Sequence, residues 1–287
     1  MLFLLFSFLL TAAPPDSLLL VSWNVENFMD YRTDSTGRYT KNRFYAKCNA
    51  VSKTLFLIAD GQGRMPDAVA LMEVGNRFVL RQLIVSTPLR KMDYEIIHFD
   101  SPDHRGIDCA LLWRRSRLKL IRASPKHLTD STGAILPTRD ILVAEFEGLD
   151  VLVNHHPSKV GKGSGGRRRI AMARMRHLMD SLASEGHGRI VSVGDFNDDV
   201  WSVPGSRGTI KYNGAWEKID GCFVQGEVRV RETVFDSPLL SEPDRAYGGT
   251  KPHRSFSGPR WLGGASDHYP IILWISARKV LRMEKKH

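Results

Sequence analysis

Residues 191–198 read Val-Ser-Val-Gly-Asp-Phe-Asn-Asp, an apolar run that stops at Gly194 and is followed by an acid and an amide. Apolar, β-branched residues bounded by a glycine predict a buried strand. Side chains two residues apart point the same way in an extended chain, so Asp195 and Asn197 can bind one object together. An Asx turn after a strand would use the same residues. The stretch alone leaves both interpretations open, and the rest of the chain decides between them.

Apolar strands recur on both sides of this stretch. Strands are predicted over residues 17–25, 67–73, 94–99, 107–113, 118–123, 141–146, 151–155, 189–193, 228–235 and 271–275. Helical periodicity predicts helices over residues 41–59, 76–87 and 167–183. Because many strands follow one another directly, we expect mixed sheets with helices outside, not a purely doubly wound fold. Residues 237–261, rich in Pro, Gly and Arg, predict a long loop of the kind that often carries function.

The composition is that of an ordinary globular chain. Of its 287 residues, 42% are hydrophobic and 25% are charged, which excludes the disordered and fibrous classes. The formal net charge of +10 favours an acidic or phosphate-bearing partner, although many basic proteins bind no nucleic acid. The three cysteines, Cys48, Cys109 and Cys222, show no CxxC spacing, which argues against a structural zinc site.

The N-terminus has the pattern of a secretory signal. Residues 1–10 are almost wholly apolar, and the small residues Ala12 and Ala13 follow, although no Lys or Arg precedes the run. A buried strand or an uncleaved anchor would have a similar composition. We expect a signal peptide over residues 1–15 and a single exported catalytic domain, periplasmic or extracellular and monomeric, over residues 16–287. No later stretch is long and apolar enough to cross a bilayer.

Polar residues recur where apolar strands end. They are Asn24, Glu73, His155, Asp195 with Asn197, Asp220, and Asp267 with His268. Any one could be a cap or a turn former, but so many after strands favour a shared site. Oxygen ligands with few cysteines suit a hard cation, Mg²⁺ or Mn²⁺. Histidines near acids suit proton transfer at a phosphate. The Gly- and Lys-rich segment 157–166 lacks the spacing of a nucleotide P-loop.

Six motifs together carry a resemblance to a known family. They are SWNVENF, LMEVGN, NHHPSK, VGDFND, IDGCFV and GGASDHYPI. The set resembles the endonuclease/exonuclease/phosphatase superfamily, the DNase I-like group of metal-dependent enzymes, from about Ser22 to Trp274. GDFND and SDHYPI are specific in combination, whereas either alone would be weak. The resemblance implies a four-layer αββα sandwich, two mixed β-sheets face to face with helices outside, and an active site at one end of the sheets.

The resemblance also implies roles for individual residues. Glu73 resembles the main metal-binding carboxylate, Asn24 assists at the metal or its water shell, and Asp267 lies where the family often ligates metal. Asp195 resembles the residue that orients or deprotonates the attacking water. The neighbouring phosphate or water contacts would come from Asn197, His155 and His268, with Asp220 orienting His268.

Four further residues are weaker candidates for contact with the substrate phosphate: Asp108, Arg139, Lys159 and Arg254. Solvated surface charge is the alternative for the three basic ones. Asp108 lies where repair-type members of the family carry a tyrosine, which argues against an abasic-site endonuclease. The alternative role of Asp108 is to orient a histidine or an arginine.

These observations predict a secreted, Mg²⁺-dependent phosphodiester hydrolase, a nuclease acting on nucleic acid through a metal-activated water. A phospholipid, phosphoinositide or other phosphate-ester hydrolase of the same fold is the alternative. An inactive phosphate-binding member is a second alternative, and the complete set of acids, amides and histidines argues against it.

Overall fold

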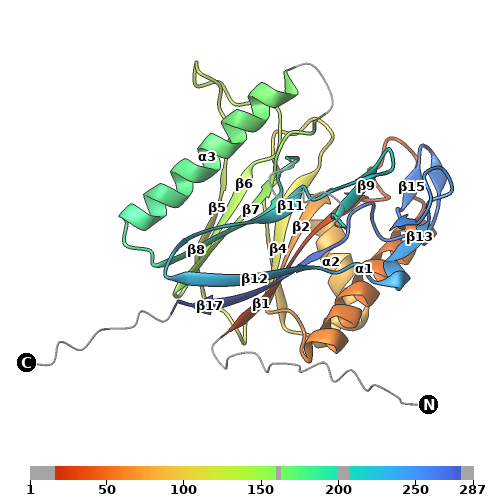
Figure 1. Cartoon of the computed structure of the whole chain (residues 1–287), viewed down its shortest axis with the longest axis horizontal. Coiled ribbons are helices and arrows are strands. Elements are labelled where there is room, and N and C mark those ends of the chain that lie inside the picture. The colour runs from red at the N-terminus through yellow and green to blue at the C-terminus, as the bar shows by residue number, and fades with distance from the viewer. Residues whose placement is uncertain (1–16, 160–162, 199–206, 279–287) are drawn as a thin grey trace, which may run out of the picture.

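The computed structural model describes residues 17–159, 163–198 and 207–278, so the expected signal peptide lies outside the described residues. Two β-sheets pack face to face, and helices cover the outer face of each (Figure 1). The predicted four-layer sandwich of two mixed sheets is confirmed.

The first sheet has six strands and is mixed. In order across the sheet, they are Val228–Val234 (β12), Ile271–Ala277 (β17), Leu18–Phe28 (β1), Ala68–Val74 (β2), Asp108–Arg114 (β4) and Tyr94–His98 (β3). β1 and β2 are parallel, and the other neighbours are antiparallel. The parallel pair brings the ends of β1 and β2 to one edge of the sandwich.

The second sheet has five strands and contains its own parallel pair. In order, they are Asp220–Gly226 (β11), Arg189–Asp195 (β8), Leu149–His155 (β7), Ile141–Phe146 (β6) and Leu120–Lys126 (β5). β7 runs parallel to β8, with His155 paired to Asp195. β11 runs antiparallel to β8, which sets Asp220 opposite Asp195. The register therefore gathers three predicted site residues at one end.

Three helices form the outer layers. Lys41–Gln62 (α1) and Arg77–Val85 (α2) cover the first sheet, and Ser164–Ser184 (α3) covers the second (Figure 1). The Thr40 side chain caps α1 by accepting a hydrogen bond from the Arg43 backbone N–H, and Gly63 ends the helix at a φ of 74°. In the described part of the chain, no helix combines the length and apolar character that a membrane span requires.

Two details of the chain path differ from the predicted ranges. The strand predicted over residues 151–155 begins earlier, at Leu149, because Phe146 already pairs with Leu149, and the hairpin between β6 and β7 turns at Glu147 and Gly148. Gly148 has a φ of 73°, which suits this tight turn. The predicted long loop is partly ordered into short strands: Ser241–Pro243 (β13), Thr250–Pro252 (β14), Phe256–Ser257 (β15) and Arg260–Trp261 (β16).

The remaining short elements lie in connections. They are Pro88–Lys91 (η1), Pro238–Leu240 (η2), Ile210–Tyr212 (β9) and Ala215–Glu217 (β10). The three cysteines are free thiols, with Cys48 and Cys109 buried. Loops that are held by a rigid scaffold, such as this sandwich, are where functional side chains are commonly positioned.

Candidate active site

Asp195, the last residue of β8, is the centre of the site. Its Oδ2 accepts a hydrogen bond from Nδ2 of Asn24 at 3.0 Å. The same oxygen lies 3.6 Å from Nε2 of His155 and 4.0 Å from Nε2 of His268. Nε2 of His155 lies in turn 3.7 Å from Oε1 of Glu73. Residues far apart in the chain thus converge on one spot.

His268 forms a buried pair with Asp220. The distance from Nδ1 of His268 to Oδ2 of Asp220 is 2.8 Å. Burial by itself lowers the pKa of His268, but the charge of Asp220, the hydrogen bond to it and the charge of Asp195 raise it well above the usual value. His268 is therefore a cation at neutral pH, with Nε2 directed toward Asp195.

The carboxyl group of Asp195 is hard to ionise. Burial, followed by the charge of Asp220, raises the pKa of Asp195 to about 7. The charge of His268 and the hydrogen bonds from Asn24 and from the backbone N–H of Asn197 oppose this rise. An acid with a pKa near neutrality is well suited to receive and release protons.

His155 is the neutral imidazole of the site. Burial, followed by the charges of Arg139 and Arg105, lowers the pKa of His155 well below its usual value. Its Nδ1 is buried and has no hydrogen-bond partner among the described residues. The pKa values of His155 and His268 are thus shifted in opposite directions, a difference that the sequence did not show.

Glu73 sits in an unusual backbone conformation at the end of β2. Its φ is 66°, in the left-handed region, where the register of β2 with β4 shifts. Its Oε2 accepts the backbone N–H of Asn27 at 2.7 Å. No Lys or Arg in the described ranges forms an ion pair with Glu73. This carboxylate, beside the neutral imidazole of His155, is an oxygen ligand of the type that a hard divalent cation such as Mg²⁺ or Mn²⁺ prefers.

Asn24 has both polar atoms of its side chain occupied. Its Nδ2 donates to Asp195, and its Oδ1 accepts the backbone N–H of Glu26 at 3.0 Å. In this arrangement Asn24 positions Asp195, and its predicted role at the metal stays a prediction.

Glu26 belongs to the site, although sequence reasoning did not single it out. Its carboxylate is 4% exposed and accepts the backbone N–H groups of Ser255 and Phe256. Arg254 lies 3.3 Å from its Oε1. The signal was available: Glu26 follows Asn24 at the same two-residue spacing that singled out Asn197 after Asp195.

Lys47, also missed, connects the segments that carry Glu26 and His268. It is fully buried in α1, an unusual place for a lysine. Its ammonium donates to the carbonyl oxygens of Glu26 at 3.3 Å and Ala265 at 2.6 Å, and to the hydroxyl of Ser255. A basic residue within an otherwise apolar helix face was the only sequence signal. Lys47 holds three chain segments together behind the site.

Two predicted residues support the carboxyl end of β7. The side-chain amide of Asn197 donates to the carbonyl oxygen of His156 at 3.0 Å. Arg139 is buried and donates to the carbonyl oxygens of His155 and His156 at 3.2 and 2.6 Å, while pairing with Asp103 at 3.0 Å. Arg139 therefore fixes the strand end that carries His155, a role that the sequence did not assign.

The remaining basic candidates are paired with acids. Arg254 pairs with Asp267 at 3.0 Å and with Glu26 at 3.3 Å. Lys159 pairs with Glu217 at 2.7 Å. Asp267 is thus held by an arginine in this structure, and its role as a metal ligand stays a prediction, as do the phosphate contacts of Lys159 and Arg254.

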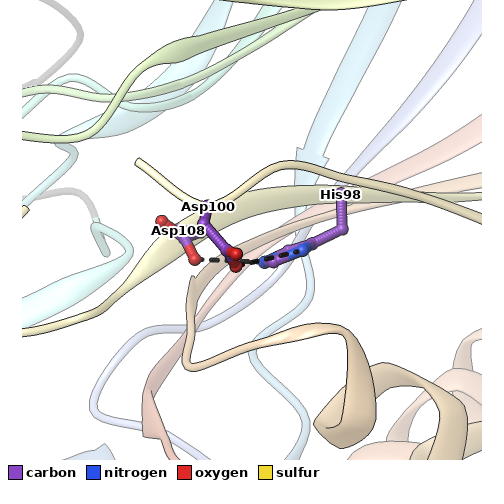
Figure 2. Close-up of side chains that lie close together, drawn as sticks. All are labelled: His98, Asp100 and Asp108. Atoms are coloured by element: carbon purple, nitrogen blue, oxygen red, sulfur yellow. Dashed lines mark hydrogen bonds and ion pairs between the residues drawn. The ribbon is translucent and has the colours of Figure 1, made fainter. Parts of the chain in front are cut away.

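Asp108 lies at the start of β4, near the same end of the first sheet. Its carboxylate accepts the Ser101 backbone N–H at 2.8 Å and lies 3.1 Å from Nε2 of His98. Figure 2 shows Asp108 and Asp100 facing the His98 ring from the same side. The Asp100 side chain is 89% exposed. Asp108 is therefore the partner of a histidine, one of the two alternatives that the sequence left open.

Comparison with known proteins places the chain among phosphoester-cleaving enzymes. A family model described as "Endonuclease/Exonuclease/phosphatase family" matches residues 22–211. No curated protein matches by sequence. Similar solved structures include a humanized TDP2 of D. rerio, at 15% identity and a TM-score of 0.57, covering 91% of this chain and all of that one. A mannosyl-6-phosphatase of Bacteroides thetaiotaomicron has 14% identity and a TM-score of 0.57, covering 90% of this chain and 99% of that one. Likeness at these identities shows the shared fold.

Proposed function

Because the chain belongs to the endonuclease/exonuclease/phosphatase family and is thereby a phosphoester hydrolase, we propose that it is a Mg²⁺-dependent phosphodiesterase acting on nucleic acid. The observation that carries the proposal is the convergence of two histidines on Asp195: Nε2 of His155 lies 3.6 Å and Nε2 of His268 lies 4.0 Å from its Oδ2. The raised pKa values of Asp195 and His268 support proton transfer at this point.

Asp195 is the group that would take the proton of the attacking water. The pKa of about 7 makes it a competent base at neutral pH, and its hydrogen bonds with Asn24 and the backbone N–H of Asn197 fix its direction. General-base assistance of this kind contributes about 10²–10⁴-fold.

His268 would stabilise the charge that builds on the phosphoryl oxygens. Its cationic state is maintained by Asp220, which is fully buried. Preorganised charge in a water-poor site needs no rearrangement during the reaction. His155, being neutral, can donate or accept one hydrogen bond without adding charge.

Glu73 would hold the cation, beside the imidazole of His155, whose Nε2 lies 3.7 Å from its Oε1. A bound Mg²⁺ supplies Lewis-acid neutralisation of a phosphoryl oxygen. What supports this assignment is the donor set: a carboxylate that has no Lys or Arg partner among the described residues, directed toward a neutral imidazole. The choice of Mg²⁺ over Mn²⁺ is part of the proposal.

The preference for nucleic acid rests on charge. A net charge of +10 favours a polyanion, and Arg167, Arg168 and Arg169 lie in the first two turns of the outer helix α3. A structure with the same fold holds D. rerio TDP2 "complexed with single strand DNA product". We further propose that residues 1–15 direct export, which N-terminal sequencing of the mature protein from the growth medium or periplasm would check.

A substrate panel tests the proposal. The purified protein with Mg²⁺ is offered single- and double-stranded DNA, RNA, bis(p-nitrophenyl) phosphate, a sugar phosphate and phosphatidylinositol phosphates. We expect cleavage of nucleic acid and of the chromogenic diester, abolished by EDTA and by Asp195→Ala. Activity confined to the sugar phosphate or the lipids would contradict the nuclease assignment.

A further inference from the structure

A pocket of about 570 Å³ opens beside the proposed catalytic centre. Its walls are three loops, at residues 33–39, 104–106 and 254–258, and its floor is the end of β1 with Gly75. Its lining includes residues outside the proposed catalytic centre, among them Arg38, Tyr39 and His104. The size suits a nucleotide-sized group.

The pocket is continuous with the residues that would hold the cation. Asn27 lines it, and the Asn27 backbone N–H holds Oε2 of Glu73. Arg254 also lines it and pairs with Asp267, next to His268. A substrate with its scissile phosphate at Glu73 and His268 would therefore extend its next group into this pocket.

The acids of the pocket are already satisfied by the protein. Asp34 accepts the backbone N–H groups of Thr36 and Tyr39 and the Thr36 hydroxyl. Glu26 accepts two backbone N–H groups and an arginine. Because the oxygens of both carboxylates already accept hydrogen bonds from the protein, Asp34 and Glu26 are poorly placed to bind a cation in the pocket.

The bases of the pocket are less well paired. Arg38, His104 and Arg105 line it and are exposed. Among the described residues, no carboxylate lies within 4.0 Å of the Arg38 guanidinium. Arg105 has one acidic partner, Asp103 at 3.5 Å, which Arg139 shares. The unneutralised charge at the pocket is therefore positive.

The buried hydroxyl of Tyr39 is an independent observation that points to a ligand in this pocket. The side chain lines the pocket and is 5% exposed, yet its hydroxyl has no hydrogen-bond partner in the part of the chain that the structure describes. Its ring is fixed edge-on against Phe256, with centroids 5.1 Å apart. Burial raises the pKa of Tyr39 well above its usual value, so the hydroxyl remains a donor. A buried donor without an acceptor is costly unless something pairs with it.

We infer that this pocket binds a second phosphate of a polynucleotide substrate, the one adjacent to the scissile phosphate, through Arg38 and Arg105, with the Tyr39 hydroxyl as a further donor. The inference rests on the proposed nuclease function and adds the residues that would select a chain over an isolated diester. Arginine suits this role because its planar donors match phosphate oxygens.

The test compares a short single-stranded oligonucleotide with bis(p-nitrophenyl) phosphate, which has no second phosphate. For Arg38→Ala/Arg105→Ala, we expect kcat/KM on the oligonucleotide to fall about tenfold or more beyond any fall on the chromogenic diester, mainly through KM. The dependence of oligonucleotide affinity on salt should also weaken by about one unit of slope per lost contact. Arg115→Ala/Arg229→Ala, which changes two exposed arginines at the opposite end of the first sheet, is the charge-matched control.

The outcomes separate this inference from the function on which it rests. Equal losses on both substrates, or no loss on either, would overturn the pocket assignment while leaving the nuclease proposal intact. Cleavage of the chromogenic diester without cleavage of any oligonucleotide would overturn both. Tyr39→Phe provides a second measurement, since it keeps the ring packing and removes only the hydroxyl; an unchanged KM for the oligonucleotide would exclude the hydroxyl as a contact.

Discussion

Two histidine–aspartate pairs, one fully buried and one with a partly exposed histidine, lie at opposite ends of the second sheet. His268 and Asp220 meet at the carboxyl end of β8, and His187 and Asp150 meet at the amino end of β7 and β8. In both pairs, Nδ1 of the histidine lies 2.8 Å from Oδ2 of the aspartate. The local geometry is therefore the same, and only the surroundings distinguish them.

The surroundings differ in how acid charge is compensated. Near His187, Glu145 lies 3.9 Å from Nε2, but Arg122 pairs with Glu145 at 2.6 Å. Near His268, no Lys or Arg of the described residues forms an ion pair with Asp195 or Asp220. An arginine thus compensates the charge of Glu145 beside His187, whereas among the described residues no Lys or Arg compensates the charges of Asp195 and Asp220 beside His268. A histidine–aspartate pair alone does not mark a catalytic site.

The largest expected difference between the two pairs is in activity. His268→Ala should lower kcat/KM on the chromogenic diester by about 10²–10⁴-fold, because it removes the cation beside Asp195. His187→Ala should change kcat/KM by less than about threefold, since it lies at the other end of the sheet. Steady-state kinetics with Mg²⁺ measure both. Similar losses in the two variants would show that the pairs are not functionally distinct.

A smaller effect is expected on cation affinity. Glu73→Gln should raise the Mg²⁺ concentration for half-maximal activity by about tenfold or more, because it removes a charged oxygen ligand. Glu145→Gln, at the far end, should leave that concentration unchanged. Titration of activity with Mg²⁺ compares them, and an unaltered midpoint in Glu73→Gln would place the cation elsewhere.

The site end should also make the metal-free protein less stable as pH rises. The pKa of Asp195 is raised by burial to about 7, so its contribution is full below the unfolded value and is lost as pH rises through about 7. The raised pKa of His268 acts in the same direction, at higher pH. Asp195→Asn should remove a fall on the order of 4 kcal/mol in the free energy of unfolding between about pH 4 and 8.

Urea denaturation in EDTA at several pH values measures this difference. Asp100→Asn is the control, because its side chain is largely exposed and should leave the pH profile unchanged. If the free energy of unfolding depends on pH in the same way in the wild type and in Asp195→Asn, folding does not raise the pKa of the Asp195 carboxyl group.

The smallest expected effect concerns stability at the far end. His187→Ala should lower the free energy of unfolding by about 1.5–3 kcal/mol, because the buried Asp150 carboxylate loses its hydrogen-bond partner. His104→Ala, an exposed histidine, should cost far less. Chemical denaturation at pH 7 tests this, and a loss no larger than that of His104→Ala would make the far pair dispensable for stability too.

Much of the site could be predicted from strand ends. Glu73, His155 and Asp195 each close an apolar run, and parallel neighbours bring such ends together. Glu26 was not predicted, and β1 is irregular at this point. Glu26 and Asn27 have φ values of 50° and 45°, which break the regular alternation of side chains along the strand. Lys47 escaped because helical periodicity places residues on a face without naming their partners.

Other predictions depended on partners that no local pattern contains. Arg139 was expected at the substrate; the structure shows that it holds the backbone after β7, and its contact with a phosphate stays a prediction. Lys159 faces Glu217, a residue 58 positions away. Long basic side chains reach several groups, and the sequence does not say which acid lies nearest.

The sequence by itself determined the strands, the helices and the residue types where strands end, because alternation, apolar runs and turn residues act over short distances along the chain. The sandwich itself was what the resemblance to the family implied. Tertiary structure decided the charge of each group. His155 and His268 are the same residue type beside the same carboxylate. Burial, followed by the charges of Arg139 and Arg105, lowers the pKa of His155, whereas the charge of Asp220 and the hydrogen bond to it outweigh burial and raise the pKa of His268. Electrostatic interactions act through space, so only the folded chain sets which histidine carries the proton.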